Sequence, residues 1–266
     1  MKNYGLKLGG IKSILGIPKI VIDESGNWEK YLPIYEPQLL NDGTDEQGCF
    51  IWGTENILET ILKSTTGIDY NFSERFVYNG MESDGTGGDP YDAGDWICNN
   101  GLIEETLLPT PSTYDEFVQP RPLSEKLRQR GRSFLDRYDI QQDYVWNGNG
   151  ISIKRKQELV TEHLRYSPLG VSVYAWTKDE NGLYYRPVGY PDVHYCVLFK
   201  EDDTAYYLFD SYDQHIKKCR KDMDFGICIR YYVKQKIAVQ PSVLSELINF
   251  ILSWRSLSKQ RILSNS

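Results

Sequence analysis

Histidine is scarce in this sequence, which contains three of them among 266 residues, His163, His194 and His215. Histidine is the side chain whose charge changes near neutral pH, so few positions can supply a general base of the usual kind. We expect His163, in TEHLRYSP, to be solvated on a surface helix, and His215 to belong to a turn. His194 is then the histidine that remains for chemistry.

Long apolar runs are absent as well. No stretch is long enough to cross a bilayer, and the opening MKNYGLKLGGIKSILGIPK lacks the uninterrupted apolar stretch and small-residue cleavage site of a signal peptide. We therefore expect no membrane span and no export by the usual route.

Positive charge is outnumbered, since 30 Lys and Arg face 37 Asp and Glu, which leaves a net charge of -7. This balance argues against nucleic acid or an anionic membrane as the main partner. Cysteine is also rare, odd in number and without metal-ligand spacing. We expect reduced, mostly buried thiols and neither a metal nor another cofactor. The five cysteines are Cys49, Cys98, Cys196, Cys219 and Cys228.

What the sequence does have is enough apolar and aromatic content, 40% and 13%, to bury a large core. Helix signals dominate the first part, and β-branched and aromatic runs such as VSVYAW, HYCVLF, AYYLFD and ICIRYYV dominate from Val171 onward. Prolines interrupt the region between them. We predict an α+β chain with an N-terminal extension (1–27), a helical lobe (28–108), a proline-rich connector and linking helix (109–150), a β-rich lobe (151–235) and a C-terminal helical extension (236–266).

The stretch VHYCVLFKEDDTAYYLFDSYD, residues 193–213, reads as two strands around an acidic turn. If EDD forms a three-residue loop, Lys200 lies opposite Thr204, and counting outward places His194 opposite Asp210 on the same face. A carboxylate held against one ring nitrogen fixes the tautomer and leaves the other nitrogen free as a base. A loop one residue longer or shorter would send the two side chains to opposite faces.

The best candidate for a nucleophile is Cys49, in DEQGCFIWGTENILETILK. The apolar residues after it follow helical spacing, and the turn-forming run before it predicts that the helix starts there. The helix dipole and a neighbouring imidazolium would lower the thiol pKa below its free value of about 8.5. A small hydrophobe packed at a helix start is the alternative. The order Cys, His, Asp along the chain favours the nucleophile.

These motifs resemble the papain-like cysteine peptidases, in a divergent form found in bacteriophages and related mobile elements. The resemblance covers most of residues 28–232 and rests on NWEKYLPIYEPQ, QGCFIWGTENILE, NFSERFVYNG, GTGGDPYDAGDWICNNGLIEE, VSVYAW, HYCVLF and LFDSYD. It implies an N-terminal helical lobe that supplies the nucleophile and a C-terminal antiparallel, β-barrel-like lobe that supplies the base, to which this chain adds a C-terminal helix. Carried over, Cys49 is the nucleophile, His194 is the base, and Asp210 stands where the family more often has asparagine.

The sequence departs from the family in three places. Phe50 follows Cys49 where the family has tryptophan, and Tyr212 replaces the tryptophan after the orienting residue. The glutamine whose amide helps to bind the oxyanion has two candidates, Gln38 and Gln47. We favour Gln38, because a separate loop can place its amide beside the thiol, whereas Gln47 is tied to the approach to the helix. A missing oxyanion donor costs about 2.7 to 4 kcal/mol in comparable sites.

The segment GTGGDP is not a phosphate loop, since no Gly-Lys-Ser/Thr follows it. The resemblance implies a cleft wall in which Gly87 and Gly88 let a substrate backbone approach closely. An ordinary loop is the alternative. We also assign Tyr212 to substrate binding.

A second alignment, anchored on Trp52, would put Ile51 at the nucleophile position and make the protein a dead peptidase. We disfavour it because the interval from Cys49 to Glu59 keeps the family's spacing between the nucleophile and a helical glutamate.

The resemblance implies a thiol hydrolase that cleaves a peptide or isopeptide bond of a peptide or protein substrate. The alternative is a virion structural or adaptor protein that uses the same scaffold with weak or no catalysis. Transglutaminase-like acyltransferases and cell-wall amidopeptidases share the residue order and form a third possibility. The 48 residues before Cys49 argue against the inhibitory propeptide of a secreted zymogen. We expect location in the host cytoplasm or the virion. The amphipathic helix at 241–261 either covers an exposed sheet face within the chain or docks on a partner protein, and we favour docking on a phage structural protein.

Overall fold

The computed structural model describes residues 6–7, 16–148, 150–212 and 215–236. The chain divides into two units, residues 1–234 and 235–266. Of the second unit only residues 235 and 236 are described, so the helix expected at 241–261 lies outside the described residues.

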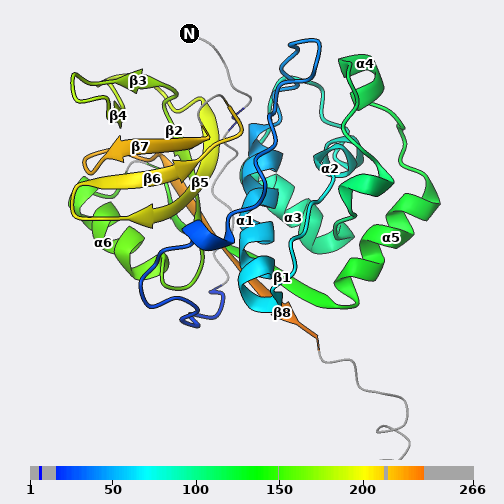
Figure 1. The fold of residues 1–266 in the computed structure, drawn as a ribbon, viewed down its shortest axis with the longest axis horizontal. Coiled ribbons are helices and arrows are strands. Elements are labelled where there is room, and N and C mark those ends of the chain that lie inside the picture. The colour runs from blue at the N-terminus through cyan, green and yellow to red at the C-terminus, as the bar shows by residue number, and fades with distance from the viewer. Residues whose placement is uncertain (1–5, 8–15, 149, 213–214, 237–266) are drawn as a thin grey trace, which may run out of the picture. The chain divides into compact units, whose positions relative to one another are not determined.

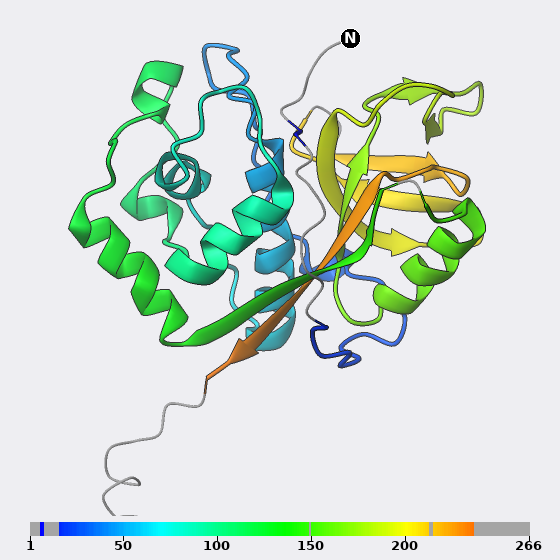
Figure 2. The same ribbon diagram turned by 180° about the vertical axis from the view of Figure 1, so that it is seen from behind.

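Helix α1 (Cys49–Thr66) is the central element of the helical part, and its first fourteen residues are all buried. It contacts α2 (Glu74–Gly80) and α3 (Pro90–Asn100) on one side and the sheet on the other, as Figures 1 and 2 show from opposite directions. A helix that is covered on both sides needs apolar residues all round, which FIW and ILETIL supply. Gly67, with a positive φ of 72°, ends the helix.

The proline-rich segment contains regular structure rather than a bare connector. Two short 3-10 helices lie upstream of it, η1 (Glu29–Tyr31) before α1 and η2 (Glu105–Leu107) after α3. The segment itself contains the single turn α4 (Tyr114–Phe117) and helix α5 (Glu125–Leu135), which packs on α3. Strand β1 (Tyr138–Asn147) follows, contacts α3 and joins the sheet beside its last strand. This segment therefore belongs to both the helical part and the sheet.

The sheet has eight strands in the order β1-β8-β2-β5-β6-β7-β4-β3. From β8 to β3 in this order, neighbouring strands pair antiparallel, except that β4 and β7 are parallel. β1 and β3 are the two edges, so the sheet does not close into a barrel within the described residues. The remaining strands are β2 (Leu169–Val173), β3 (Thr177–Lys178), β4 (Tyr184–Tyr185), β5 (His194–Glu201), β6 (Ala205–Phe209), β7 (Ile216–Arg220) and β8 (Ile227–Gln235).

Helix α6 (Ile153–His163) corrects one expectation from the sequence. His163 is buried on the same helical face as Val160 and Lys156, so the expectation that it is solvated was wrong. Burial, aided by the nearby charge of Arg230, lowers the pKa of His163 to about 4. The residue is therefore neutral at physiological pH and packs with its ring edge against Tyr166.

Candidate active site

The thiol of Cys49 lies where the helical part meets the sheet. Cys49 is the first residue of α1, which confirms the predicted start of the helix. Its side chain is 0% exposed, and a backbone hydrogen bond from Tyr195, the residue after His194, reaches its sulfur. Because β5 packs against α1, the start of the helix and the start of the strand are brought together.

His194 and Asp210 form a buried pair. His194 Nε2 lies 2.5 Å from Asp210 Oδ1, and the two side chains are fully buried. A carboxylate on Nε2 holds the proton there, so Nδ1 is the basic nitrogen of the ring. This is the contact that the sequence predicted.

The strand register that produces this contact was predicted wrongly. Lys200 pairs with Tyr207, not with Thr204. At this register an even-numbered residue faces an odd-numbered one, and continuing it would put His194 and Asp210 on opposite faces of the sheet.

A β-bulge between Leu198 and Lys200 corrects the alternation. Beyond it Leu198 pairs with Leu208, so even-numbered residues face even-numbered ones again. His194 and Asp210 consequently lie on the same face of the sheet, with Asp210 two residues away from the position directly opposite His194. A bulge next to a functional pair that re-aims one side chain is a recurring device in β-sheets.

Lys217, on β7, is a member of the site that sequence reasoning missed. Its Nζ lies 2.7 Å from Asp210 Oδ2 and donates a hydrogen bond of 2.9 Å to the carbonyl of Tyr212. Burial alone would raise the pKa of Asp210, but the charges and hydrogen bonds of His194 and Lys217 outweigh it and hold that pKa below its usual range. The available signal was the strand alternation in IKKCR, which turns the first lysine inward.

Gln38 lies against the loop that follows Asp210, in a network with Asp45 and Tyr212. Its Nε2 donates to Asp45 Oδ1 at 3.0 Å and to the Tyr212 hydroxyl at 3.1 Å, and its Oε1 accepts from Ser211 Oγ at 3.0 Å. The Tyr212 hydroxyl donates to the second oxygen of Asp45. The Tyr212 ring lies edge-on to His194, with 5.4 Å between ring centroids. Sequence reasoning missed Asp45.

Gln47, the other candidate for the oxyanion donor, occupies the turn before α1. Its φ is 59°, in the left-handed region, and its backbone N–H donates to Asp45 Oδ1 at 2.9 Å. Both glutamines therefore contact Asp45, but Gln38 also touches the loop that follows Asp210. The oxyanion role of Gln38 and the substrate role of Tyr212 remain predictions.

Electrostatics around Cys49 oppose the thiolate that we expected. Burial raises the thiol pKa well above its ordinary value, and the carboxylates of Asp45, Asp210 and Glu46 raise it further. The backbone hydrogen bond from Tyr195 lowers it, but by less than burial raises it. The direction is therefore opposite to the expected depression of the pKa in this arrangement, because desolvation is the largest contribution.

Gly88, half of the predicted cleft wall, lies directly beside the residue after the thiol. A Cβ added to Gly88 would come within 2.5 Å of Phe50 Cε2. The chain's own N-terminal region is already paired with this wall. Leu6 forms a parallel β-bridge with Gly88, and the Lys7 N–H donates to the Gly88 carbonyl at 2.8 Å.

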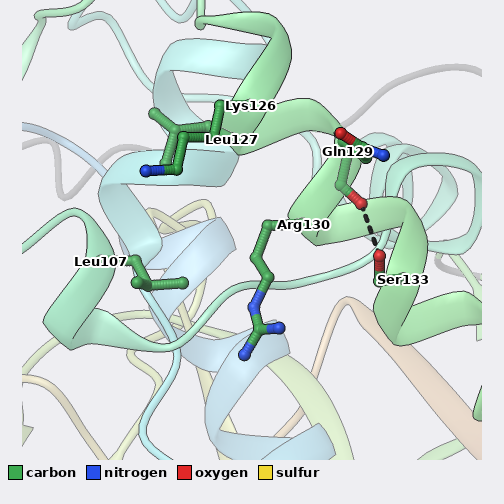
Figure 3. A pocket seen from close by; sticks show the side chains of 6 residues that line it. All are labelled: Leu107, Lys126, Leu127, Gln129, Arg130 and Ser133. Atoms are coloured by element: carbon green, nitrogen blue, oxygen red, sulfur yellow. Dashed lines mark hydrogen bonds between the residues drawn. The ribbon is translucent and has the colours of Figure 1, made fainter.

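A hollow lies elsewhere, on α5. It holds about 600 Å³ and is lined by Leu107, Lys126, Leu127, Gln129, Arg130 and Ser133, with Ser133 bonded back to the Gln129 carbonyl (Figure 3). None of the candidate catalytic residues lines it. The described residues contain no cluster of His, Cys, Asp or Glu suited to a metal ion. No helix among them has the length and apolar character needed to span a bilayer.

Several solved structures share this fold. The bromelain protease from Ananas comosus in complex with the E64 inhibitor is 16% identical, with a TM-score of 0.55 over 79% of this chain and 98% of its own. A recombinant stem bromelain precursor is 16% identical, with a TM-score of 0.56 over 89% of this chain and 78% of its own. The proform of the ragweed pollen allergen Amb a 11, a cysteine protease, is 13% identical, with a TM-score of 0.54 over 87% of this chain and 62% of its own.

No protein-family model and no curated protein matches the sequence. The structural likeness confirms the predicted α+β, papain-like fold.

Proposed function

We propose that this chain is a papain-like thiol hydrolase that cleaves a peptide or isopeptide bond, with Cys49 as nucleophile, His194 as base and Asp210 as orienting residue. The observation that carries the proposal is the 2.5 Å contact between His194 and Asp210, buried beside a helix that begins with a cysteine. The fold shared with cysteine proteases supports it.

In the proposed reaction Cys49 passes its proton to His194 Nδ1, and the sulfur attacks the carbonyl carbon of the substrate. The C–N bond breaks as His194 protonates the leaving amine, which leaves a thioester on Cys49. His194 then takes a proton from water, the hydroxide displaces the acyl group, and the proton returns to the sulfur. Asp210 holds the imidazole orientation through both halves.

The oxyanion that forms in each half needs donors near the start of α1. Gln38 supplies an amide if its Nε2 leaves Asp45 and the Tyr212 hydroxyl, which it contacts in the closed arrangement. The first amides of α1 point toward the same end of the helix, where the dipole favours negative charge. Because Gln38 is already engaged, we expect substrate binding to reorganise this network.

Substrate also has to reach a thiol that is 0% exposed. The pairing of Leu6 and Lys7 with Gly88 is the arrangement that an extended substrate backbone would adopt on this wall. We expect the substrate to replace that N-terminal contact.

The test is site-selective labelling of the native protein by E64, the inhibitor bound in the bromelain structure, and by iodoacetamide. Cys49 should be labelled faster than the other four cysteines. Cys98, the only half-buried cysteine, is the internal control, because simple exposure would make it react first. If Cys98 reacts first, or Cys49 reacts only after unfolding, the hydrolase proposal fails.

One observation favours the second candidate, a scaffold or adaptor protein with weak or no catalysis. Burial and three nearby carboxylates raise the pKa of the Cys49 thiol in this arrangement, which is unfavourable for a nucleophile. That role fits the expected phage or mobile-element origin, location in the host cytoplasm or virion, and docking of the helix at 241–261 on a phage structural protein. A truncation ending at Val239 that keeps every binding partner would refute the docking.

A further inference from the structure

Lys217 is a buried cation placed directly behind the candidate catalytic pair. On β7 its side chain points into the protein at 1% exposure, while the next residue, Lys218, is exposed on the other face. Burying an ammonium group is costly unless a charge partner compensates it. The Asp210 carboxylate does so at 2.7 Å, and the Trp176 ring adds a cation–π contact with 5.0 Å between Nζ and the ring centroid.

The Asp210 carboxylate therefore interacts with both the His194 imidazole and the Lys217 ammonium group. One oxygen faces His194 Nε2 and the other faces Lys217 Nζ. A neutral amide side chain at the same position would present one acceptor oxygen to the imidazole and no net charge. A carboxylate with a buried ammonium presents the same acceptor, and the two charges sum to zero.

We propose that Lys217 is a positioning residue, which offsets part of the charge of Asp210 so that the pair orients His194 with less negative charge beside the Cys49 thiol. This inference rests on the proposed function, since it assigns Lys217 a role in the reactivity of that thiol. Lys217 also holds the loop after Asp210 through the Tyr212 carbonyl, and the Tyr212 ring packs on His194. The imidazole is thus fixed from its nitrogen and from its ring face.

Other titratable groups face this pair from the surrounding elements. They are Cys49 on α1, Cys196 on β5, Cys219 on β7, Tyr184 on β4, and Tyr212 and Asp45 near Gln38. Asp45 and Glu46 already place negative charge near the thiol. Asp210 adds to that charge, and without Lys217 its effect on the thiol should be larger.

The experiment measures the rate of Cys49 alkylation by iodoacetamide against pH in four full-length proteins. Lys217→Met leaves an uncompensated negative charge and should shift the midpoint of the profile to higher pH. Asp210→Asn leaves an uncompensated positive charge and should shift it to lower pH. The double variant D210N/K217M has no net charge at this position, so its midpoint should return to that of the unsubstituted protein.

Lys218→Met is the matched control, because it removes the same charge from the exposed face of the same strand and should leave the midpoint in place. Equal midpoints in all variants, or shifts of one sign, would overturn the positioning role and leave Lys217 a structural residue. If Lys217→Met does not fold, the comparison of Asp210→Asn with the double variant makes the same test. If Cys49 of the unsubstituted protein reacts only on unfolding, the proposed function itself has failed.

Discussion

Leu6→Ala should speed the labelling of Cys49 by E64. Leu6 is 8% exposed and forms a β-bridge with Gly88, the residue that we propose as part of the substrate-binding wall. We expect the inhibitor to compete with the N-terminal segment for Gly88. Weakening the contact of Leu6 with Gly88 should therefore release the N-terminal segment more often.

The size of the effect follows from the burial of one leucine. Burying a leucine side chain contributes about 1.5 to 3 kcal/mol, most of which alanine loses. A loss of about 2 kcal/mol raises the population of the open state about 30-fold, since each 1.4 kcal/mol is a factor of ten. The second-order rate of labelling should rise by about this factor as long as the closed state dominates.

The assay follows the intact mass of the protein over time at one pH and several inhibitor concentrations. Leu123→Ala is the control, because Leu123 is also buried, at 4% exposure, and lies in the segment just before α5. It should lower the free energy of unfolding without raising the labelling rate. A Leu6→Ala rate no higher than that of the unsubstituted protein would refute competition between the N-terminal segment and substrate.

Three further predictions concern the wall, stability and the base. Gly88→Ala should cost about 1 to 3 kcal/mol of stability in urea unfolding, because its Cβ would come within 2.5 Å of the Phe50 ring, whereas Gly16→Ala, with nothing within 4 Å, should cost far less. Burial raises the pKa of Glu105 to about 7. The contribution of Glu105 to the free energy of unfolding is therefore full below the unfolded pKa of about 4.3 and is lost as pH rises to about 7. Glu105→Gln should flatten a plot of Tm against pH over that window, and an unchanged slope would contradict this. His194→Ala should slow neutral-pH alkylation of the α1 thiol at least tenfold under conditions where the variant is still folded, and an equal rate would show that the imidazole does not activate it.

Local patterns in the sequence determined the elements that carry the candidate site. The turn-forming run before Cys49 and the helical spacing after it predict the start of α1, because caps and periodicity act within one or two turns. The aromatic and β-branched runs around His194 and Asp210 predict a hairpin for the same reason. The order of these elements predicted an α+β chain, and the family resemblance that the motifs carry implied the papain-like fold.

Only the tertiary structure decided how those elements meet. The bulge between Leu198 and Lys200 sets the side-chain alternation, and a single inserted residue leaves no clear mark in a hydrophobic pattern. The ion pair of Lys217 with Asp210 and the pairing of Leu6 with Gly88 join segments far apart in the chain.

The direction of the Cys49 pKa shift was also decided by the tertiary structure. A pKa is a sum over desolvation and charges that the fold assembles from distant residues. Local sequence supplied the helix start, but the burial that raises the thiol pKa exists only once the strands have packed against α1.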